Sequence, residues 1–347
     1  MNLRALMFTL CLGLAVLAPA EGLNPSAAAP GYRLLASLPL PGDKGWDLLS
    51  ADSAGGRLYL SHGDQVLVVD TVGQTLLAQM GPFQGTHGIA LAPGLNRGYI
   101  TDGKADEVVC FNLKTLSITA HIKAGSKSDV VILDPLTERV WAFNADSGSV
   151  TIIQAGDNRV VKTLELGGAP EFAVADGKGL LWVNLEDKSQ VLKIDSKKME
   201  ILARWDTAPG EEPSSLSFDA KHHRLFLGCH NRMAVVLDSD SGRFVARLPI
   251  GERVDGSAYD PINRLIFHSC GEGTLSVVHE DTPDEYSVIG NIATEKGART
   301  IALDAKTHRL YLPSASFGPA PEPSAENPHP RPAMLPGSFH LLVFGKP

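Results

Sequence analysis

The sequence predicts an all-β fold, a seven-bladed β-propeller whose last blade is closed by the N-terminal strand. One observation is a repeated unit of arginine, an apolar residue and a mostly aromatic residue, first seen as Arg57-Leu58-Tyr59. Seven copies occur, six of them with the arginine and the fourth with Leu180 in its place, at intervals of 40, 42, 41, 44, 40 and 45 residues. Each copy also has four short stretches in which β-branched residues alternate with small or polar ones, a pattern typical of strands bounded by turns. This period with four strands per copy indicates propeller blades.

Each copy begins with an apolar strand that ends in a turn, often at an aspartate, before the second strand. In the first copy we expect strands near Asp47–Ser50, Arg57–Ser61, Gln65–Asp70 and Thr75–Met80. The first six copies span Trp46–Met80, His87–Ile122, Asp129–Leu166, Glu171–Trp205, Ser214–Ile250 and Asp255–Ile292. The arginine that opens the second strand recurs in six copies. We expect it to be structural and to pair with the preceding aspartate across the turn.

The seventh copy has three strands near the C-terminus, at Thr300–Ala305, Arg309–Ser314 and Phe339–Gly345. The segment Tyr32–Leu40 resembles the fourth strands of other copies, such as Phe244–Ile250. An N-terminal strand that completes the last blade closes a ring and removes exposed sheet edges. A linear array would not need its ends to complement each other in this way.

A proline-rich loop, Pro313–Pro336, lies between the second and third strands of the seventh copy and carries eight prolines. Proline has no N–H to donate to a sheet, and such long loops in compact domains are usually functional or disordered. We expect the loop to pack over one end of the ring and to narrow access to Asp47, His87 and Arg299. The apolar residues that can anchor it are Phe317, Met334 and Leu335. A solvated tether is the alternative.

Residues 1–20 have a basic residue, an apolar run and an Ala-Pro-Ala end, which together are typical of a secretory signal peptide. A membrane anchor is the alternative, but the run is shorter than the ~18–20 apolar residues that a span needs. Residues 21–30 then form a flexible lead-in and residues 31–347 the propeller. The sequence therefore predicts a periplasmic or secreted protein with no membrane span after signal removal.

The chain has 31 basic and 39 acidic residues, a net charge of −8 that becomes −9 when Arg4 leaves with the signal. This balance disfavours nucleic acid, which is bound by neutralising phosphates. Cys11 also leaves, so Cys110, Cys229 and Cys270 remain, and an odd count leaves at least one thiol unpaired within the chain. Cys229 and Cys270 follow the second strands of adjacent repeats and are the candidate disulfide. The sequence does not show whether their Cα atoms lie within the ~7 Å that a bridge needs.

Two second strands share a short pattern, Tyr99-Ile100-Thr101-Asp102 and Trp182-Val183-Asn184. They approximate the tetrapeptide that gives the YVTN-repeat, YncE-like propellers of bacterial envelopes their name, and the chain resembles this family from Tyr32 to Pro347. Segments 168–177, 278–281 and 327–332 resemble an uncharacterised secreted subgroup, some of whose members carry a gluconolactonase-like label based on propeller similarity. The resemblance also implies that relatives often have a cysteine where this chain has Gly210, as the partner of the position of Cys229.

Strong catalytic signatures are absent: the sequence has no Cys-x-x-Cys, His-Glu-x-x-His, Gly-x-Ser-x-Gly or P-loop motif. What remains is positional, because the residues that open the innermost strands face one end of the ring, which we call the mouth. Ser214 holds the fifth of these positions. We expect a small ligand to bind at the mouth, an environment that favours pockets. The candidate ligand-binding residues are Trp46, Asp47, His87, Asp129, Glu171, Asp255 and Arg299.

Four carboxylates at the mouth make a metal site one hypothesis. Crowded carboxylates either have raised pKa values or recruit a cation, and oxygen ligands favour Ca²⁺ or Mg²⁺. The alternative is a wet polar mouth balanced by His87 and Arg299, and no cofactor is required by the sequence. The candidate metal ligands are Asp47, Asp129, Glu171 and Asp255.

Polar residues at or after second-strand ends could form an outer ring on the same face, where histidines could be ligands, acid–base groups or simply solvated. This outer ring comprises His62, Asn144, Asn184, His230 and His268. The pair His222-His223 and the acidic turn around Glu280 are expected to be solvated.

The sequence favours a monomeric binding or scaffold protein whose partner is a small molecule or another envelope protein. The alternative is a metal-assisted lactonase- or lyase-like enzyme that uses the acidic mouth.

Overall fold

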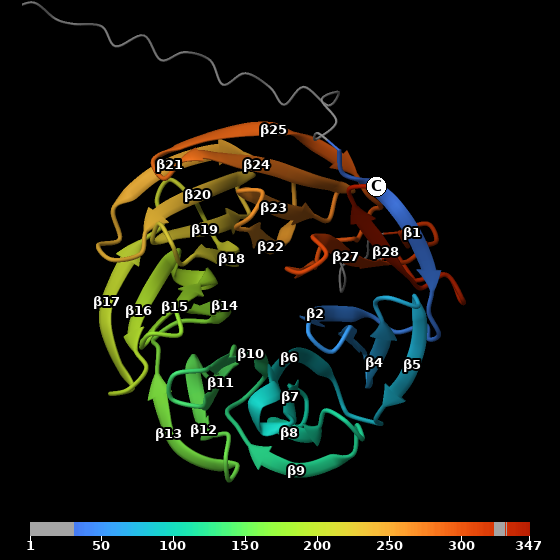
Figure 1. The fold of residues 1–347 in the computed structure, drawn as a ribbon, viewed down its shortest axis with the longest axis horizontal. Helices are drawn as coiled ribbons and strands as arrows, with labels where there is room; N and C mark the ends of the chain where they lie inside the picture. Colours follow the sequence, from blue (N-terminus) through green and yellow to red (C-terminus); the bar gives the residue numbers. More distant parts are fainter. Residues whose placement is uncertain (1–30, 323–329, 331) are drawn as a thin grey trace, which may run out of the picture.

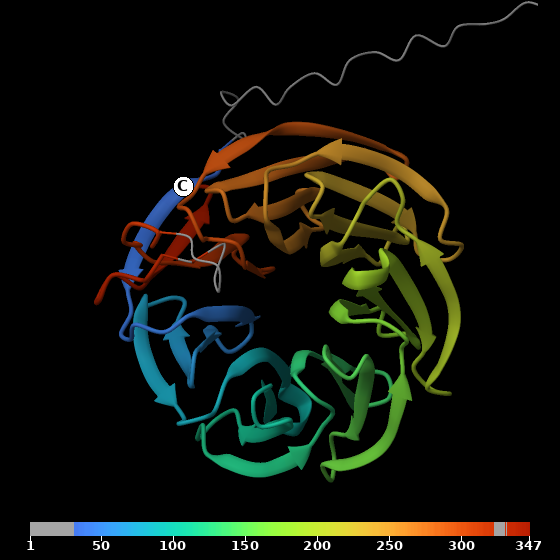
Figure 2. The same cartoon turned by 180° about the vertical axis from the view of Figure 1, so that it is seen from behind.

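The computed structural model describes residues 31–322, 330 and 332–347. The predictions for residues 1–20, for residues 21–30 and for the tip of the proline-rich loop lie outside the described residues. Seven four-stranded antiparallel sheets are arranged as a ring, with their innermost strands around a central axis (Figures 1 and 2). The predicted seven-bladed β-propeller is confirmed.

Blades are numbered here in chain order. Blade one contains β2 (Trp46–Asp52), β3 (Arg57–His62), β4 (Gln65–Asp70) and β5 (Thr75–Met80). Blade two contains β6 (Thr86–Ala92), β7 (Arg97–Asp102), β8 (Glu107–Asn112) and β9 (Ile118–Lys123). Blade three contains β10 (Ser128–Asp134), β11 (Arg139–Asn144), β12 (Ser149–Gln154) and β13 (Arg159–Glu165). Blade four contains β14 (Pro170–Ala175), β15 (Leu180–Leu185), β16 (Gln190–Asp195) and β17 (Glu200–Asp206).

The remaining blades follow the same plan. Blade five contains β18 (Pro213–Asp219), β19 (Arg224–Cys229), β20 (Met233–Asp238) and β21 (Phe244–Pro249). Blade six contains β22 (Val254–Asp260), β23 (Leu265–Cys270), β24 (Thr274–Thr282) and β25 (Glu285–Ala293). Blade seven contains β26 (Ala302–Asp304), β27 (Arg309–Ser314), β28 (His340–Gly345) and β1 (Arg33–Pro39). The described helices are short 3₁₀ turns, η1 (Pro93–Leu95) and η2 (Glu186–Lys188); within the described part of the chain, no helix is long and apolar enough to cross a membrane.

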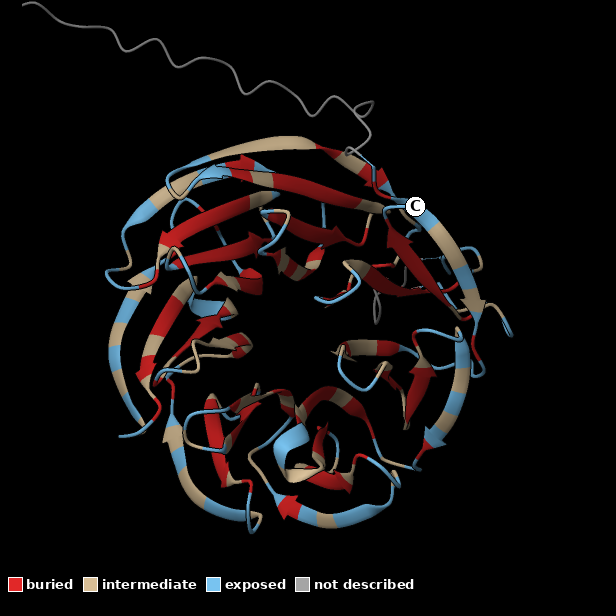
Figure 3. Ribbon diagram, in the orientation of Figure 1, coloured by how far each residue is buried: buried red, intermediate tan, exposed pale blue. Residues whose placement is uncertain are grey.

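The core lies between neighbouring blades. The two middle strands of each blade are largely buried, whereas an outer strand such as β5 alternates exposed and half-buried residues (Figure 3). Tyr59 and Val68 of blade one, for example, pack with Ile100 and Phe111 of blade two in one apolar cluster. Because each sheet buries both faces against its neighbours, a break anywhere in the ring exposes apolar surface on two blades.

The ring is closed as the sequence predicts. Strand β1 pairs antiparallel with β28, for example Leu38 with Leu341, and lies at the outer edge of blade seven (Figure 1). Leu58 of blade one and Leu341 of blade seven share a further inter-blade cluster. Hydrogen bonds between β1 and β28, from the two ends of the chain, thus hold the first and last blades together.

The recurrent arginine is structural, but the prediction of its partner is wrong. Arg57 Nη1 donates to the carbonyl oxygen of Leu113 in the next blade at 2.6 Å, and Arg139 Nη1 donates to that of Ser196 at 2.9 Å. The aspartate across the turn instead accepts backbone N–H groups of that turn, as Asp52 does from Gly55 at 2.8 Å. In five blades the arginine therefore connects its blade to the next one around the ring, whereas Arg264 donates to Asp281 O of its own blade at 3.1 Å.

We expect Arg139→Ala to lower the free energy of unfolding by about 1–2 kcal/mol, because two backbone carbonyls, of Ser196 and Lys197, lose a charged donor. Urea denaturation followed by far-UV circular dichroism measures this change. Arg159→Ala is the control, since the Arg159 side chain forms an exposed ion pair with Asp157 at 3.6 Å, and its loss should cost less than about 0.5 kcal/mol. Equal losses in the two variants would show that the inter-blade bond contributes nothing.

Candidate functional site

The mouth residues lie where the inner strands begin. Asp47, His87, Asp129, Glu171 and Asp255 are each the second residue of their strand. In each of these strands the pairing with the second strand is shifted directly after the first residue, as between Trp46 and Leu49. Such a bulge leaves a residue unpaired and re-aims its side chain. The repeat therefore delivers one polar side chain per blade to the same end of the ring.

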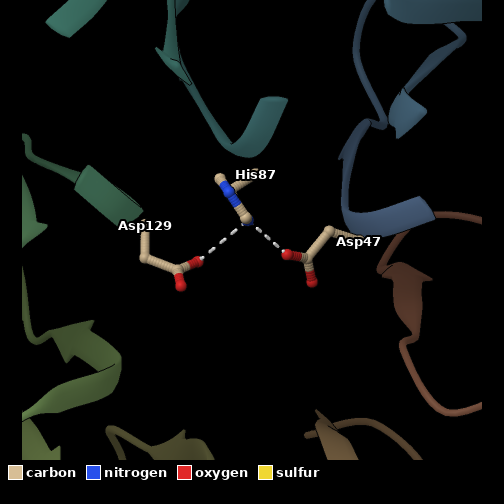
Figure 4. Close-up of side chains that lie close together, drawn as sticks. All are labelled: Asp47, His87 and Asp129. Atoms are coloured by element: carbon tan, nitrogen blue, oxygen red, sulfur yellow. Dashed lines mark hydrogen bonds and ion pairs between the residues drawn. The ribbon is translucent and has the colours of Figure 1, made fainter. Parts of the chain in front are cut away.

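Three of the predicted residues come together. His87 Nδ1 lies 2.7 Å from Asp47 Oδ2 and 3.7 Å from Asp129 Oδ1, so the imidazole stands between carboxylates from the two flanking blades (Figure 4). Burial alone would lower the pKa of His87, but the hydrogen bond that the imidazole donates to Asp47 and the charges of Asp129 and Asp47 outweigh it and raise the pKa. One ligand atom from each residue lies within 4.8 Å of the others, so the group could hold a metal ion.

The other carboxylates of the mouth are crowded and desolvated. Burial and the charge of Asp129 raise the pKa of Glu171 to about 9, so this side chain is protonated at neutral pH. Burial raises the pKa of Asp255 to about 7, although the Arg299 guanidinium, which donates to Asp255, opposes the rise. Burial and the charge of Asp47 raise the pKa of Asp129 to about 6. Glu171 and Asp255 do not join the group around His87 as metal ligands.

A large cavity opens at the mouth between blades six, seven, one and two. Its volume is about 1290 Å³, and four of the candidate ligand-binding residues line it: Trp46, Asp47, His87 and Arg299. Its further lining residues are Gly45, Lys104, Arg253, Gly271, Glu295, Lys296, Gly297, Ala315, Ser316, Phe317, Gly318, Pro332 and Met334. A smaller cavity of about 340 Å³ shares Arg253 and Arg299 with it and includes Asp255 and His230.

The described ends of the proline-rich loop form part of this cavity. Gly318 N donates to Ala333 O at 2.9 Å and Leu335 N donates to Ser316 O at 2.8 Å, so the two ends pair with each other. The Phe317 ring lies 6.2 Å from the Trp46 ring. The described ends of the loop thus border the mouth beside Trp46.

The outer ring is not formed, because most of its members are buried between blades. His62 and Asn144 end their strands and pair with Trp46 and Ser128, which places them inside the interface rather than on the rim. Asn184 is buried and donates to Pro213 O. His268 lies within β23, not at its end, and burial lowers its pKa to about 4.

His230, another member of the predicted outer ring, lies at a cavity. It lines the smaller cavity, and its Nδ1 lies 3.3 Å from Glu212 Oε2 and 3.6 Å from Glu186 Oε1.

The predicted disulfide between Cys229 and Cys270 is also wrong, since both thiols are free and buried, as is Cys110. The two residues occupy the same position in blades five and six, opposite Pro213 and Val254. Cys229 packs against blade four and Cys270 against blade five, so the sheet of blade five separates them. A Cβ atom at position 210 would lie 2.6 Å from Cys229 Sγ, so Gly210 adjoins the thiol that the resemblance pairs with it.

Sequence reasoning missed the basic residues of the mouth. Lys104 lies in the turn after the second strand of blade two. Arg253 directly precedes β22, and Lys296 lies in the connection between β25 and β26. A usable signal existed for Arg253 and Lys296, because they lie within three residues of Asp255 and Arg299 in the sequence; Lys104, in the turn after β7, had no such signal. The prediction started from one position per blade and added only Trp46 beside it, so these neighbours were left out.

The fold and the mouth define the class of protein: a seven-bladed β-propeller with a polar, partly basic cavity at the entry end of its inner strands. The chain belongs to the family described as "Domain of unknown function (DUF5074)", whose model matches residues 50–229. The resemblance to YncE-like propellers is confirmed by two relatives from Salmonella typhimurium and Salmonella typhi, each described as "Uncharacterized protein YncE". Both are 30% identical over 149 residues, which cover 41% of this chain and 42% of the relative.

A solved structure supports the fold. "Kuenenia stuttgartiensis Hydrazine Synthase" matches with a TM-score of 0.68 and 15% identity, covering 79% of this chain and 92% of that chain. At this identity the likeness shows the propeller fold alone.

Proposed function

We propose that the protein is a periplasmic or secreted binding propeller that takes a small organic anion at the mouth. The observation that carries the proposal is the cavity of about 1290 Å³, which combines four basic side chains with two aromatic ones. The signal peptide expected at residues 1–20 supports the location. Ligand pockets of this kind are largely apolar with a few placed polar groups.

The charges of the cavity support an anion. Lys104, Arg253, Lys296 and Arg299 line it against the carboxylates of Asp47 and Glu295, so its lining is basic in a chain of net charge −8. A clefted basic surface raises the local concentration of anions. Trp46 and Phe317 offer planar faces for an apolar part of the same ligand.

Thermal-shift screening of the full chain against small carboxylates and phosphate esters tests the proposal. Any organic anion that binds should bind at least about tenfold more weakly to a Lys104→Gln/Lys296→Gln variant, since each lost charge contact is worth roughly 1 kcal/mol or more. Lys306→Gln, an exposed lysine in the turn between β26 and β27, is the matched control. The proposal would be contradicted if the anion bound the double variant as tightly as the parent protein, or if no anion bound at all.

The second candidate, a metal-assisted lactonase- or lyase-like enzyme, is favoured by the grouping of Asp47, His87 and Asp129. These residues would hold a divalent ion, which lowers the pKa of bound water to generate hydroxide. In the same screen, stabilisation by Ca²⁺ or Mg²⁺ that Asp129→Asn abolishes would support this candidate over the anion site.

A further inference from the structure

Glu280 is a buried carboxylate at the end of the ring opposite the mouth. The sequence predicted a solvated acidic turn, and for Glu280 this is wrong, because the residue is fully buried near the end of β24. Its Oε2 accepts the Tyr259 hydroxyl. Its Oε1 has no hydrogen-bond partner, and among the buried side-chain atoms of the described residues it is the one carboxylate oxygen in that condition. Burying such an atom without a partner is costly.

Two further groups converge on this oxygen. His222 Nδ1 lies 3.4 Å from Glu280 Oε1 and 2.6 Å from Asp219 Oδ2. The Asp219 side chain is 2% exposed and that of Glu280 1%, whereas the His222 side chain is 24% exposed. Two buried carboxylates therefore share one imidazole, through which the group reaches solvent. One nitrogen can donate its proton to only one of them.

The repeat explains the contact between His222 and Asp219. Three residues after the turn aspartate, other blades also place a side chain that donates to that aspartate. The equivalents are Thr137 to Asp134 at 2.6 Å, Asn263 to Asp260 at 2.7 Å and Thr307 to Asp304 at 2.7 Å. This contact alone is therefore a feature of the turn.

The repeat does not explain Glu280. The backbone N–H of Glu280 donates to the carbonyl oxygen of Arg264, the residue directly before β23. The equivalent bond, to the residue before the second strand, is present in five other blades. The residues that make this bond there are Thr71, Leu113, Ala155, Ser196 and Ser239. They are all buried, and none is charged. Blade six alone puts a carboxylate at this position, in a hairpin whose two strands have nine residues each.

We infer that Asp219, His222 and Glu280 bind a first-row divalent cation of the zinc type at the interface of blades five and six. Imidazole nitrogen as a ligand favours zinc and its neighbours over Ca²⁺ and Mg²⁺. Ligand atoms about 2.0–2.1 Å from Zn²⁺ lie roughly 3.3 Å apart in a tetrahedron. The separation of 3.4 Å between His222 and Glu280 fits that geometry, and the His222–Asp219 separation of 2.6 Å has to lengthen as the ion replaces the shared proton. The Tyr259 hydroxyl and the Lys221 N–H orient the two carboxylates.

Isothermal titration of the chelator-treated full chain with Zn²⁺, and visible absorption with Co²⁺, test this inference. The His87→Gln substitution disrupts the group of Asp47, His87 and Asp129 at the mouth. Zn²⁺ that this variant binds is therefore bound at another site. We expect one ion per chain in this background. Glu280→Gln should weaken Zn²⁺ binding by at least about 100-fold, more than the 10–100-fold typical of losing a group that only orients a ligand.

Two variants separate the site from folding effects. His222→Asn should weaken binding similarly while it keeps the turn, because asparagine makes the same contact at Asn263. Glu285→Gln, at an exposed carboxylate of the same hairpin, should bind Zn²⁺ as the parent does. Melting of each metal-free variant checks that it is folded. No Zn²⁺ binding in the His87→Gln background, or binding unchanged by both Glu280→Gln and His222→Asn, would overturn the inference.

Discussion

Deletion of residues 31–40 is expected to abolish cooperative unfolding of the monomer and to cause aggregation, rather than to lower stability slightly. Strand β1 supplies the outer strand of blade seven, and Leu40 N donates to Phe339 O at 3.0 Å just beyond it. Tyr32 packs on Phe267 with ring centroids 5.1 Å apart. Without this segment, β28 becomes an open edge of apolar residues, which is a template for pairing with other chains.

Size-exclusion chromatography and calorimetry measure this effect. A graded pair of substitutions accompanies the deletion: Tyr32→Ala removes a buried ring, whereas Leu34→Ala alters a side chain that is 48% exposed. Tyr32→Ala should cost about 3 kcal/mol and Leu34→Ala well under 1 kcal/mol. A truncated protein that stays monomeric and melts as the full chain does would show that β1 does not hold the ring closed.

The repeat made the fold predictable from sequence. Strands β4 and β5 begin and end where the alternation of residues predicts, and β1 was found by its likeness to other fourth strands. Local pattern sufficed because each blade is built from neighbouring segments of chain. The partner of Arg139 was not predictable in this way, since it lies 57 residues ahead in the next blade.

The site was only partly predictable for the same reason. Counting back from the repeated arginine located Asp47 and His87, because the register of the first hairpin is conserved between blades. The direction of a side chain at a strand end depends on the neighbouring blade, which the pattern does not contain. His62 was therefore assigned to the rim although it stacks on Phe339 inside the ring, and Glu280 was assigned to solvent although it is buried against blade five.

Glu171→Gln is expected to stabilise the protein increasingly as pH rises. Burial, then the charges of Asp129 and Glu186, raise the pKa of Glu171 from an ordinary 4.5 to about 9 in the folded state. Between these values the folded protein holds a proton that the unfolded chain has released, so this group makes the free energy of unfolding fall as pH rises. Glutamine keeps the shape of the protonated acid and removes the titration. The gain should be near zero at about pH 5 and on the order of 2 kcal/mol at about pH 9, after allowance for screening by water at the mouth.

Urea unfolding of both proteins across this pH range measures the difference, with Glu200→Gln on the exposed outer strand β17 as the control. The control should show no such slope. A gain for Glu171→Gln that is constant with pH would mean that Glu171 is already ionised in the folded protein. In that case the mouth is better hydrated than its crowded carboxylates imply, or a cation compensates them. The calcium-loaded and chelator-treated proteins separate these two explanations, because only a bound cation would make the slope return on chelation.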